Sequence, residues 1–232
     1  MTTFTILELR TGRVEPYGPK GEPSAINKQP TDRSLLATAE GLEGDEQGDR
    51  RHHGGLDKAL HAYAVVHYET WARELPDAAD RFAPGAFGEN LVVDGVTEHD
   101  LCLGDQFQMG KARVELSQSR QPCWKLNLRF NRSDMARRVQ ATGRTGWYFR
   151  VLNPGVITAS AEAHLIARPN AEWPLARVWR LLYYDALDRD ALGAFLGVQE
   201  LPDRWRRLAE RRLASGQVED WNSRTWTPQQ RD

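Results

Sequence analysis

The sequence predicts an α+β fold, mainly β with helices, in which a barrel or sandwich of short strands is followed by a small helical unit. Two patterns in the 232 residues support this prediction. Up to about Ala167, short apolar segments alternate with glycine and proline turns, as in barrels and sandwiches. After Ala167, apolar residues recur at helical spacing. We therefore expect a β-domain over residues 1–167 and a three-helix unit with a tail over residues 168–232.

The first part of the chain alternates strand-like and turn-like segments. β-branched and aromatic residues favour strands, whereas glycine and proline mark the turns between them. In chain order we expect a strand within 3–14, a turn-rich loop over 16–23 and a short strand at 61–63 that leads into a helix ending near 73. Residues 87–93 are expected to be a turn that enters a strand, followed by a hairpin turn at Asp94-Gly95.

The second part adds strands and then helices. We expect strands at 101–107, 111–116 and 147–152, and a helix at 135–140 that Ser133 or Asp134 caps and Gly143 ends. Three further helices are predicted to begin near Pro174, Asp190 and Pro202. The arginines of the last helix are expected on its solvent face; they are Arg204, Arg206, Arg207, Arg211 and Arg212.

Composition narrows the class of protein. The net charge is −1 and opposite charges are interspersed, which argues against nucleic-acid or membrane partners. The first residues lack the pattern of a secretion signal, and no apolar stretch reaches 18 residues. We therefore predict a cytoplasmic protein whose anion-binding sites, if it has any, are local.

The two cysteines lie in different surroundings. Cys102 stands between two leucines, as a core residue would. Cys123 follows a strand and a proline and lies between Arg120 and Lys125, whose positive charge favours a thiolate. A thiolate is a nucleophile or a soft metal ligand; the alternative is a buried structural cysteine. A disulfide between the two is disfavoured in a reducing compartment.

Cations and glycines recur together along the first two-thirds of the chain. Successive glycines let backbone N–H groups converge on an anion, and Lys or Arg adds charge-assisted hydrogen bonds. These features favour a phosphate site, the alternative being ordinary turns and surface cations. The residues concerned are Lys28, His53, Gly54, Gly55, Arg120, Lys125, and Arg144 to Gly146.

Four segments, taken in order, resemble the motifs of MOSC domains, the family of the molybdenum cofactor sulfurase C-terminal domain. They are Gly41-Leu-Glu-Gly-Asp-Glu46, His53-Gly-Gly-Leu-Asp-Lys-Ala59, Phe87-Gly-Glu-Asn-Leu91 and Ser117-Gln-Ser-Arg-Gln-Pro-Cys-Trp-Lys125. The helical unit and the segment Glu219-Asp-Trp-Asn-Ser-Arg-Thr-Trp226 further resemble the YiiM branch of that family. One departure is Ser119, where a proline is usual, which could alter the approach to Cys123.

The resemblance implies a MOSC-type β-barrel that holds a mononuclear molybdenum cofactor (molybdopterin) with Cys123 as a metal ligand. It implies that the pterin and its phosphate are held by Lys28, His53, Gly54, Gly55, Asn90, Arg120 and Lys125. The implied reaction reduces small N-hydroxylated compounds, such as 6-N-hydroxylaminopurine, to amines. His53 and Glu89 are candidate proton or substrate contacts, or else structural hydrogen-bonding residues.

Electrons for such a reaction must come from a partner. Two cysteines are too few for an all-cysteine iron–sulfur cluster, and no dinucleotide-binding glycine fingerprint is present. We therefore expect an external reductase of flavoprotein or ferredoxin type. Two other functions stay open, a hydrolase with Cys123 as nucleophile and His53 as base, and a carrier of sulfur or molybdenum cofactor that uses Cys123.

Overall fold

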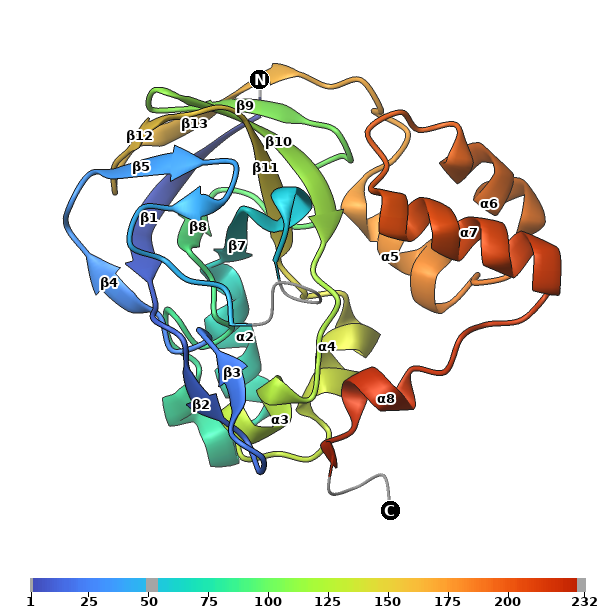
Figure 1. Ribbon diagram of the computed structural model, residues 1–232, viewed down its shortest axis with the longest axis horizontal. Helices are drawn as coiled ribbons and strands as arrows, with labels where there is room; N and C mark the ends of the chain where they lie inside the picture. The colour runs from blue at the N-terminus through green and yellow to red at the C-terminus, as the bar shows by residue number, and fades with distance from the viewer. Residues whose placement is uncertain (1, 49–53, 229–232) are drawn as a thin grey trace.

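The structure is a computed structural model, and it describes residues 2–48 and 54–228 (Figure 1). Its strands are β1 (Thr3–Thr11), β2 (Glu15–Tyr17), β3 (Glu22–Ser24), β4 (Gln29–Thr31), β5 (Leu35–Thr38), β6 (Gly41–Leu42), β7 (Leu60–Ala64), β8 (Leu91–Asp94), β9 (Gln106–Met109), β10 (Ala112–Ser119), β11 (Trp147–Asn153), β12 (Gly155–Ile157) and β13 (Glu162–Ala167). Its α-helices are α2 (Val66–Glu74), α3 (Lys125–Arg129), α4 (Met135–Thr142), α5 (Leu175–Tyr183), α6 (Arg189–Leu196), α7 (Asp203–Ser215) and α8 (Asn222–Thr225), and 3₁₀ helices span Leu56–Lys58 and Pro76–Arg81. The predicted α+β class is confirmed.

Seven strands close into a barrel. Their order is β13-β9-β10-β11-β7-β8-β1, and the start of β1 pairs with β13 to complete the ring. Every pairing in the ring is antiparallel except that of β7 with β8. The far end of β1 pairs with β4, outside the ring. Closure removes the exposed edges that would otherwise be free to pair with another chain.

Aromatic rings fill the inside of the barrel. Phe4, Phe107 and Phe149 come from three different strands, and their ring centroids lie 5.1 to 6.4 Å apart. Each is at most 2% exposed. Because a small barrel packed in this way has no room for a ligand inside, a binding site must lie on its outer surface.

Strand β7 is buried on both faces. Leu60, Ala62 and Ala64 belong to the barrel core, whereas Tyr63 belongs to a second apolar cluster that includes residues of α2, α3 and α4. Side chains alternate along a strand, so His61 points to the same outer side as Tyr63. His61, the polar residue of this apolar strand, is therefore buried on the outer side of the barrel wall.

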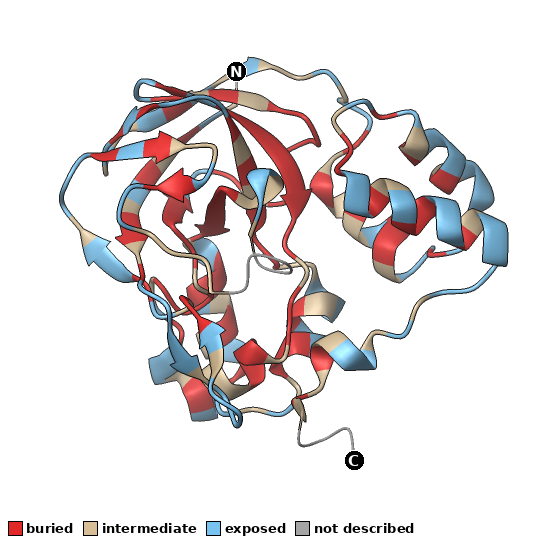
Figure 2. Ribbon diagram, viewed as in Figure 1, coloured by how far each residue is buried: buried red, intermediate tan, exposed pale blue. Residues whose placement is uncertain are grey.

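The three predicted helices after residue 167 are confirmed as α5, α6 and α7. Helix α5 lies against β10, and apolar residues of all three helices belong to the same buried cluster as the barrel core. Figure 2 shows the other faces of α6 and α7 largely exposed. The division after residue 167 into two separate domains stays a prediction. Within the described ranges no helix has the length and apolar character needed to cross a bilayer.

One arginine contradicts the predicted basic face of α7. Arg212 is 2% exposed, and its guanidinium donates to the carbonyl oxygens of Leu181 and Leu182 and forms an ion pair with Glu219. These carbonyl groups belong to the last turns of α5, which have no further helical N–H donors. The run of arginines was therefore only partly a solvent-exposed face.

Three local predictions were wrong. Residues 16–23 form a hairpin of β2 and β3 rather than a loop. Asp94-Gly95 closes no hairpin, because β8 pairs with β1 and β7 and not with the next strand. Residues 101–105 form turns in which Asp105 accepts a hydrogen bond from the Cys102 N–H, and strand β9 begins only at Gln106.

Candidate functional site

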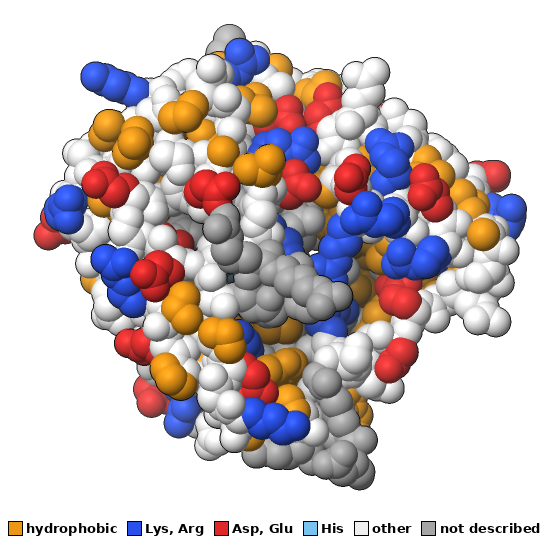
Figure 3. Space-filling model, in the orientation of Figure 1, with side chains coloured by type: hydrophobic (Ala, Val, Ile, Leu, Met, Phe, Trp, Pro, Cys, Tyr) orange, Lys and Arg blue, Asp and Glu red, His pale blue; other side chains and the backbone are white. Residues whose placement is uncertain are grey.

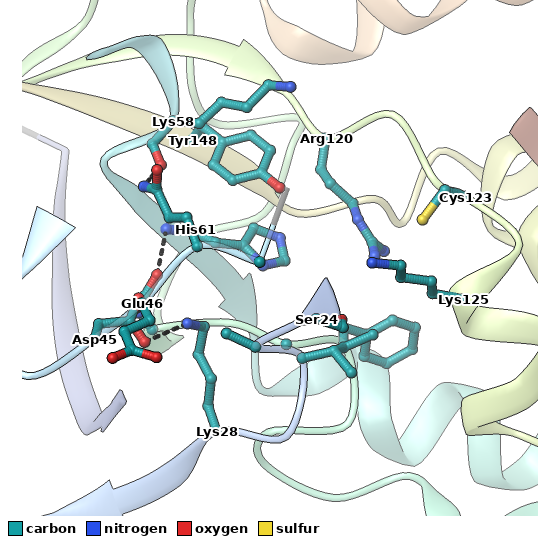
Figure 4. Close-up of a pocket in the computed structure, with 17 residues that line it drawn as sticks. Ser24, Lys28, Asp45, Glu46, Lys58, His61, Arg120, Cys123, Lys125 and Tyr148 are labelled. Carbon is teal, nitrogen blue, oxygen red and sulfur yellow. Dashed lines mark hydrogen bonds and ion pairs between the residues drawn. The ribbon is translucent and has the colours of Figure 1, made fainter. Parts of the chain in front are cut away.

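A cavity lies on the outer face of the barrel wall formed by β7 and β11, and Cys123 lines it (Figure 4). Its empty volume, measured out to the solvent at its mouth, is about 610 Å³. The lining residues come from segments far apart in the sequence, which the barrel brings together.

The floor of the cavity is a cross-strand pair. His61 on β7 is the direct register partner of Tyr148 on β11, and their ring centroids lie 4.9 Å apart. The neighbouring residues Ala62 and Trp147 belong to the barrel core, so the two rings point outward together. The strand pairing therefore fixes both rings toward the cavity.

Cys123 lies in the turn between β10 and α3. Strand β10 ends at Ser119, and the Arg120 N–H then donates to the Gly146 carbonyl oxygen at 2.9 Å. After Pro122, the Leu126 N–H donates to the Cys123 carbonyl oxygen at 3.0 Å, which starts α3. Cys123 is 8% exposed and is not in a disulfide. The thiol is thus held at the wall of the cavity, between a strand end and a helix start.

Two buried nitrogen atoms of residues that line the cavity lack a hydrogen-bond partner among the described residues. They are Nη1 of Arg120 and Nε2 of His61. Burial lowers the pKa of His61 well below its usual range, and the positive charge of Arg120 lowers it further. His61 is therefore neutral at neutral pH and offers one donor and one acceptor. Unpaired buried polar atoms are costly, and a bound ligand would satisfy them.

Lys28 lines the cavity, but its ammonium already has an anionic partner. Its Nζ forms an ion pair with Oδ1 of Asp45, and both side chains are buried. Asp45 also accepts hydrogen bonds at 2.8 Å from the Gly12 N–H and from Nδ2 of Asn90. The predicted contact between Lys28 and a phosphate therefore competes with an internal salt bridge.

The predicted residues Asn90 and Lys125 also line the cavity. The Asn90 side chain accepts from the His61 N–H at 3.1 Å and donates to Asp45 and to the Arg10 carbonyl oxygen. Its amide thus joins β7 to β1. Lys125 is 6% exposed and donates to the Pro23 carbonyl oxygen at 2.8 Å. That contact ties the start of α3 to the β2–β3 hairpin.

Glu89 does not line the cavity, although its neighbours Gly88 and Asn90 do. Its carboxylate is fully buried and accepts hydrogen bonds from the Tyr68 hydroxyl and from the N–H groups of Gly85 and Phe87. Burial raises the pKa of Tyr68, and the negative charge of Glu89 raises it further. Because its carboxylate already accepts hydrogen bonds from three internal donors, Glu89 has the contacts of a structural residue and not those of a substrate-binding residue.

Gly54 and Gly55 line a different cleft, together with Lys58, Arg204 and Arg207. This cleft lies between the 54–58 segment and α7, and Figure 3 shows Lys and Arg side chains gathered on this face. Lys58 lines both the cleft and the Cys123 cavity. His53 lies outside the described residues. The described part of the predicted glycine loop therefore lies beside the Cys123 cavity and does not line it.

Other members of the predicted sets are placed away from the cavity. The Arg144 guanidinium forms an ion pair with Glu74 and stacks over the Trp71 ring, 3.8 Å from its centroid. Cys102 is 4% exposed, and burial raises the pKa of its thiol. Arg144 is therefore no part of an anion site here, and Cys102 is the core residue that the sequence predicted.

Sequence reasoning missed several residues that line the cavity, among them Asp45, His61 and Tyr148. Asp45 was inside a recognised motif but had no assigned role. His61 carried a usable signal, because it is the polar residue between Leu60 and Ala62 in a strand buried on both faces. Tyr148 carried none, because its position depends on the register between β7 and β11.

Comparisons with known proteins agree with this architecture. Residues 49–163 match the model of the MOSC domain family, and residues 173–216 match the YiiM-like, 3-alpha helix domain. The chain is 40% identical to protein YiiM of Escherichia coli (strain K12) over 220 residues, which cover 95% of this chain and 97% of that protein. It is 37% identical over 179 residues to a protein of Gibberella moniliformis named "Reductase", covering 76% of this chain but 32% of that protein. The crystal structure of YiiM from Escherichia coli superposes with a TM-score of 0.79 at 36% identity, covering 94% of this chain and 99% of that one.

Proposed function

The chain belongs to the MOSC domain family and carries the YiiM-like three-helix unit, and from this membership we propose that it is a molybdenum-cofactor-dependent oxidoreductase that reduces N-hydroxylated compounds to amines. One observation carries the proposal. A single cavity is lined by the cysteine together with Arg120 and His61, each of which has a buried nitrogen atom with no hydrogen-bond partner among the described residues. The similarity to a protein named as a reductase supports a redox role.

The residues present fit the cofactor. A thiolate is the soft ligand that molybdenum accepts, and Cys123 places one at the cavity wall. Among the described residues no group of three or more His, Cys, Asp and Glu side chains could hold a metal ion. Within the described ranges a metal at Cys123 therefore finds too few protein ligands, and a pterin dithiolene would supply the others.

The nitrogen donors fit the organic part of the cofactor. Nη1 of Arg120 can donate to a phosphate or pterin oxygen, and Lys125 adds a second cation at the same side of the cavity (Figure 4). We place Lys28 in a supporting role, because its charge is shared with Asp45. Bound there, the cofactor supplies the two-electron redox centre at which an N–O bond is cleaved.

The groups that could supply protons for this reduction are the neutral side chains of His61 and Tyr148. Reduction of a hydroxylamine consumes two electrons and two protons and gives an amine and water. His61 is neutral, and its Nε2 has no hydrogen-bond partner in the described part of the chain, so it can orient the N–OH group or pass a proton to it. The Tyr148 hydroxyl lines the same cavity, and burial raises its pKa, so it stays protonated.

The proposal is tested by metal content and turnover together. Purified from cells that make the cofactor, the protein should contain molybdenum close to one atom per chain. With NADH or NADPH alone it should not reduce 6-N-hydroxylaminopurine, because its two cysteines cannot form an all-cysteine cluster. Addition of a flavoprotein or ferredoxin-type reductase should start turnover, measured as amine product by chromatography.

The alternatives predict different results. A metal-free protein with an activity that alkylating agents abolish would indicate a cysteine-nucleophile hydrolase or transferase. Release of sulfur or molybdenum to an acceptor protein without turnover would indicate a carrier. Rapid turnover with NADH or NADPH alone would show that the protein takes electrons from the nucleotide directly and needs no partner reductase, contrary to the proposal.

Arg120→Ala should weaken cofactor retention. Loss of a charge-assisted hydrogen bond costs about 1.5–3 kcal/mol, or roughly one to two decades in affinity. The rate of molybdenum loss during dialysis should rise accordingly, while the melting temperature changes little. Arg144→Ala is the matched control, because that guanidinium pairs with Glu74 outside the cavity. Equal retention in the two variants would remove Arg120 from the binding site.

A further inference from the structure

The segment that follows α7 returns to the turn that holds Cys123. It contains α8, and in Figure 1 it runs from the helical unit to the region of α3 and α4. Thr225 and Thr227 of this segment are buried, although the segment is otherwise short and irregular. One of its residues, Arg224, contacts both sequence neighbours of Cys123.

Arg224 binds both peptide groups that flank Cys123. Its Nη1 donates to the Pro122 carbonyl oxygen, which belongs to the peptide group before Cys123. Its own carbonyl oxygen accepts from the Trp124 N–H at 2.8 Å, in the peptide group after Cys123. The rotation of these two peptide planes sets φ and ψ of Cys123, which in turn set the direction of the Cα–Cβ bond. Arg224 therefore restrains the direction of the Cα–Cβ bond that carries the sulfur.

The Arg224 side chain is itself held on two sides. Its Nη2 donates to Oε1 of Gln140 on α4 at 2.5 Å, and its guanidinium lies 5.7 Å from the ring centroid of Tyr183 on α5. The next residue adds a parallel link, because Nδ2 of Asn127 donates to the Thr225 carbonyl oxygen at 2.9 Å. The Cys123 turn is thus connected through Arg224 to both the barrel side and the helical unit.

We propose that Arg224 is a positioning residue for Cys123, and that the segment after α7 serves to hold the thiol in the orientation that the cofactor requires. The second half of this statement rests on the proposed function, whereas the first rests only on the contacts. A guanidinium suits the task because its planar fork donates to Pro122 and Gln140 at once. A lysine has one nitrogen and would serve these two acceptors less well.

The test measures the thiol in cofactor-free protein, so it does not depend on enzyme activity. Iodoacetamide alkylation of Cys123 should be about ten-fold faster in Arg224→Ala than in the wild type, because the turn loses a charge-assisted restraint. Peptide mapping separates Cys123 from Cys102. Arg224→Lys should lie between the two, and the melting temperature should change by only a few degrees in either variant.

Arg189→Ala is the matched control. Arg189 also donates from its guanidinium to a backbone carbonyl oxygen, that of Leu213, but within the helical unit. It should leave the alkylation rate of Cys123 unchanged. If Arg224→Ala fails to fold, Gln140→Ala tests the same restraint, since it removes one partner of Arg224 and should also accelerate alkylation.

Two results would overturn the assignment. One is a wild-type alkylation rate in a folded Arg224→Ala variant; the other is an equal acceleration in Arg189→Ala, which would indicate general loosening. Neither depends on molybdenum, so a protein that proves to be metal-free would reject the proposed function and leave this assignment standing.

Discussion

Cys123→Ser should abolish N-reduction and leave the protein folded. Serine is nearly isosteric with cysteine, but its hydroxyl is a hard and weakly acidic group that does not supply a soft anionic ligand. The side chain lies at a cavity wall and not in the barrel core, so the melting temperature of the cofactor-free variant should stay within a few degrees of the wild type. Molybdenum content should fall to background.

Cys102→Ser provides the matched control. Cys102 is buried beside β9, and its thiol lies 3.6 Å from the Ala171 carbonyl oxygen. A hydroxyl placed there costs about 1–3 kcal/mol if its hydrogen bond is poor, which corresponds to a fall of roughly 2–10 °C in melting temperature. Activity per folded molecule should stay at the wild-type level.

The two variants should therefore separate stability from activity. Cys123→Ser would be stable and inactive, and Cys102→Ser less stable and active. Full molybdenum occupancy and full activity in Cys123→Ser would show that the thiolate is not the metal ligand, and the proposed mechanism would have to be abandoned.

The sequence predicted those parts of the fold whose signal is local. Gly143 ends α4 with a left-handed conformation, and the apolar spacing after Pro174 gives α5. Asp94-Gly95 shows the limit, because a good hairpin dipeptide was overridden by the pairing of β8 with β1 and β7. Pairing partners distant in sequence are set by the whole barrel, and a local pattern carries no information about them.

In the candidate site, too, the residues close together in the sequence were predicted and the distant contacts were not. Arg120, Cys123 and Lys125 lie within six residues, so one segment predicted that they belong together. The partner of Lys28 is 17 residues away, and the residue that holds the Cys123 turn is 101 positions later at Arg224. The sequence left Glu89 open between a proton or substrate contact and a structural hydrogen-bonding residue. Only the structure shows the three internal donors that favour the structural role.

Asp45→Asn should be strongly destabilising. Asp45 is the anionic partner of Lys28, and the side chains of the two residues are only 4% and 8% exposed. Loss of one partner of a buried ion pair leaves an uncompensated charge, which costs about 3–5 kcal/mol. For a chain of this size the melting temperature should fall by roughly 10 °C, measured by calorimetry on cofactor-free protein. Glu46→Gln, the neighbouring acid that pairs with Arg13 at the surface, should leave it nearly unchanged.

A double-mutant cycle then decides what Lys28 does. If its main partner is Asp45, Lys28→Met combined with Asp45→Asn should be less destabilised than the sum of the two single variants, because no unpaired charge is left buried. If Lys28 instead serves chiefly to bind a phosphate, the effects of the two substitutions on stability should simply add, and Lys28→Met should lose molybdenum as readily as Arg120→Ala. Additive stabilities would therefore return Lys28 to the cofactor-binding set, and strong coupling would make it part of the scaffold that holds β1, β7 and the Asp45 loop around the cavity.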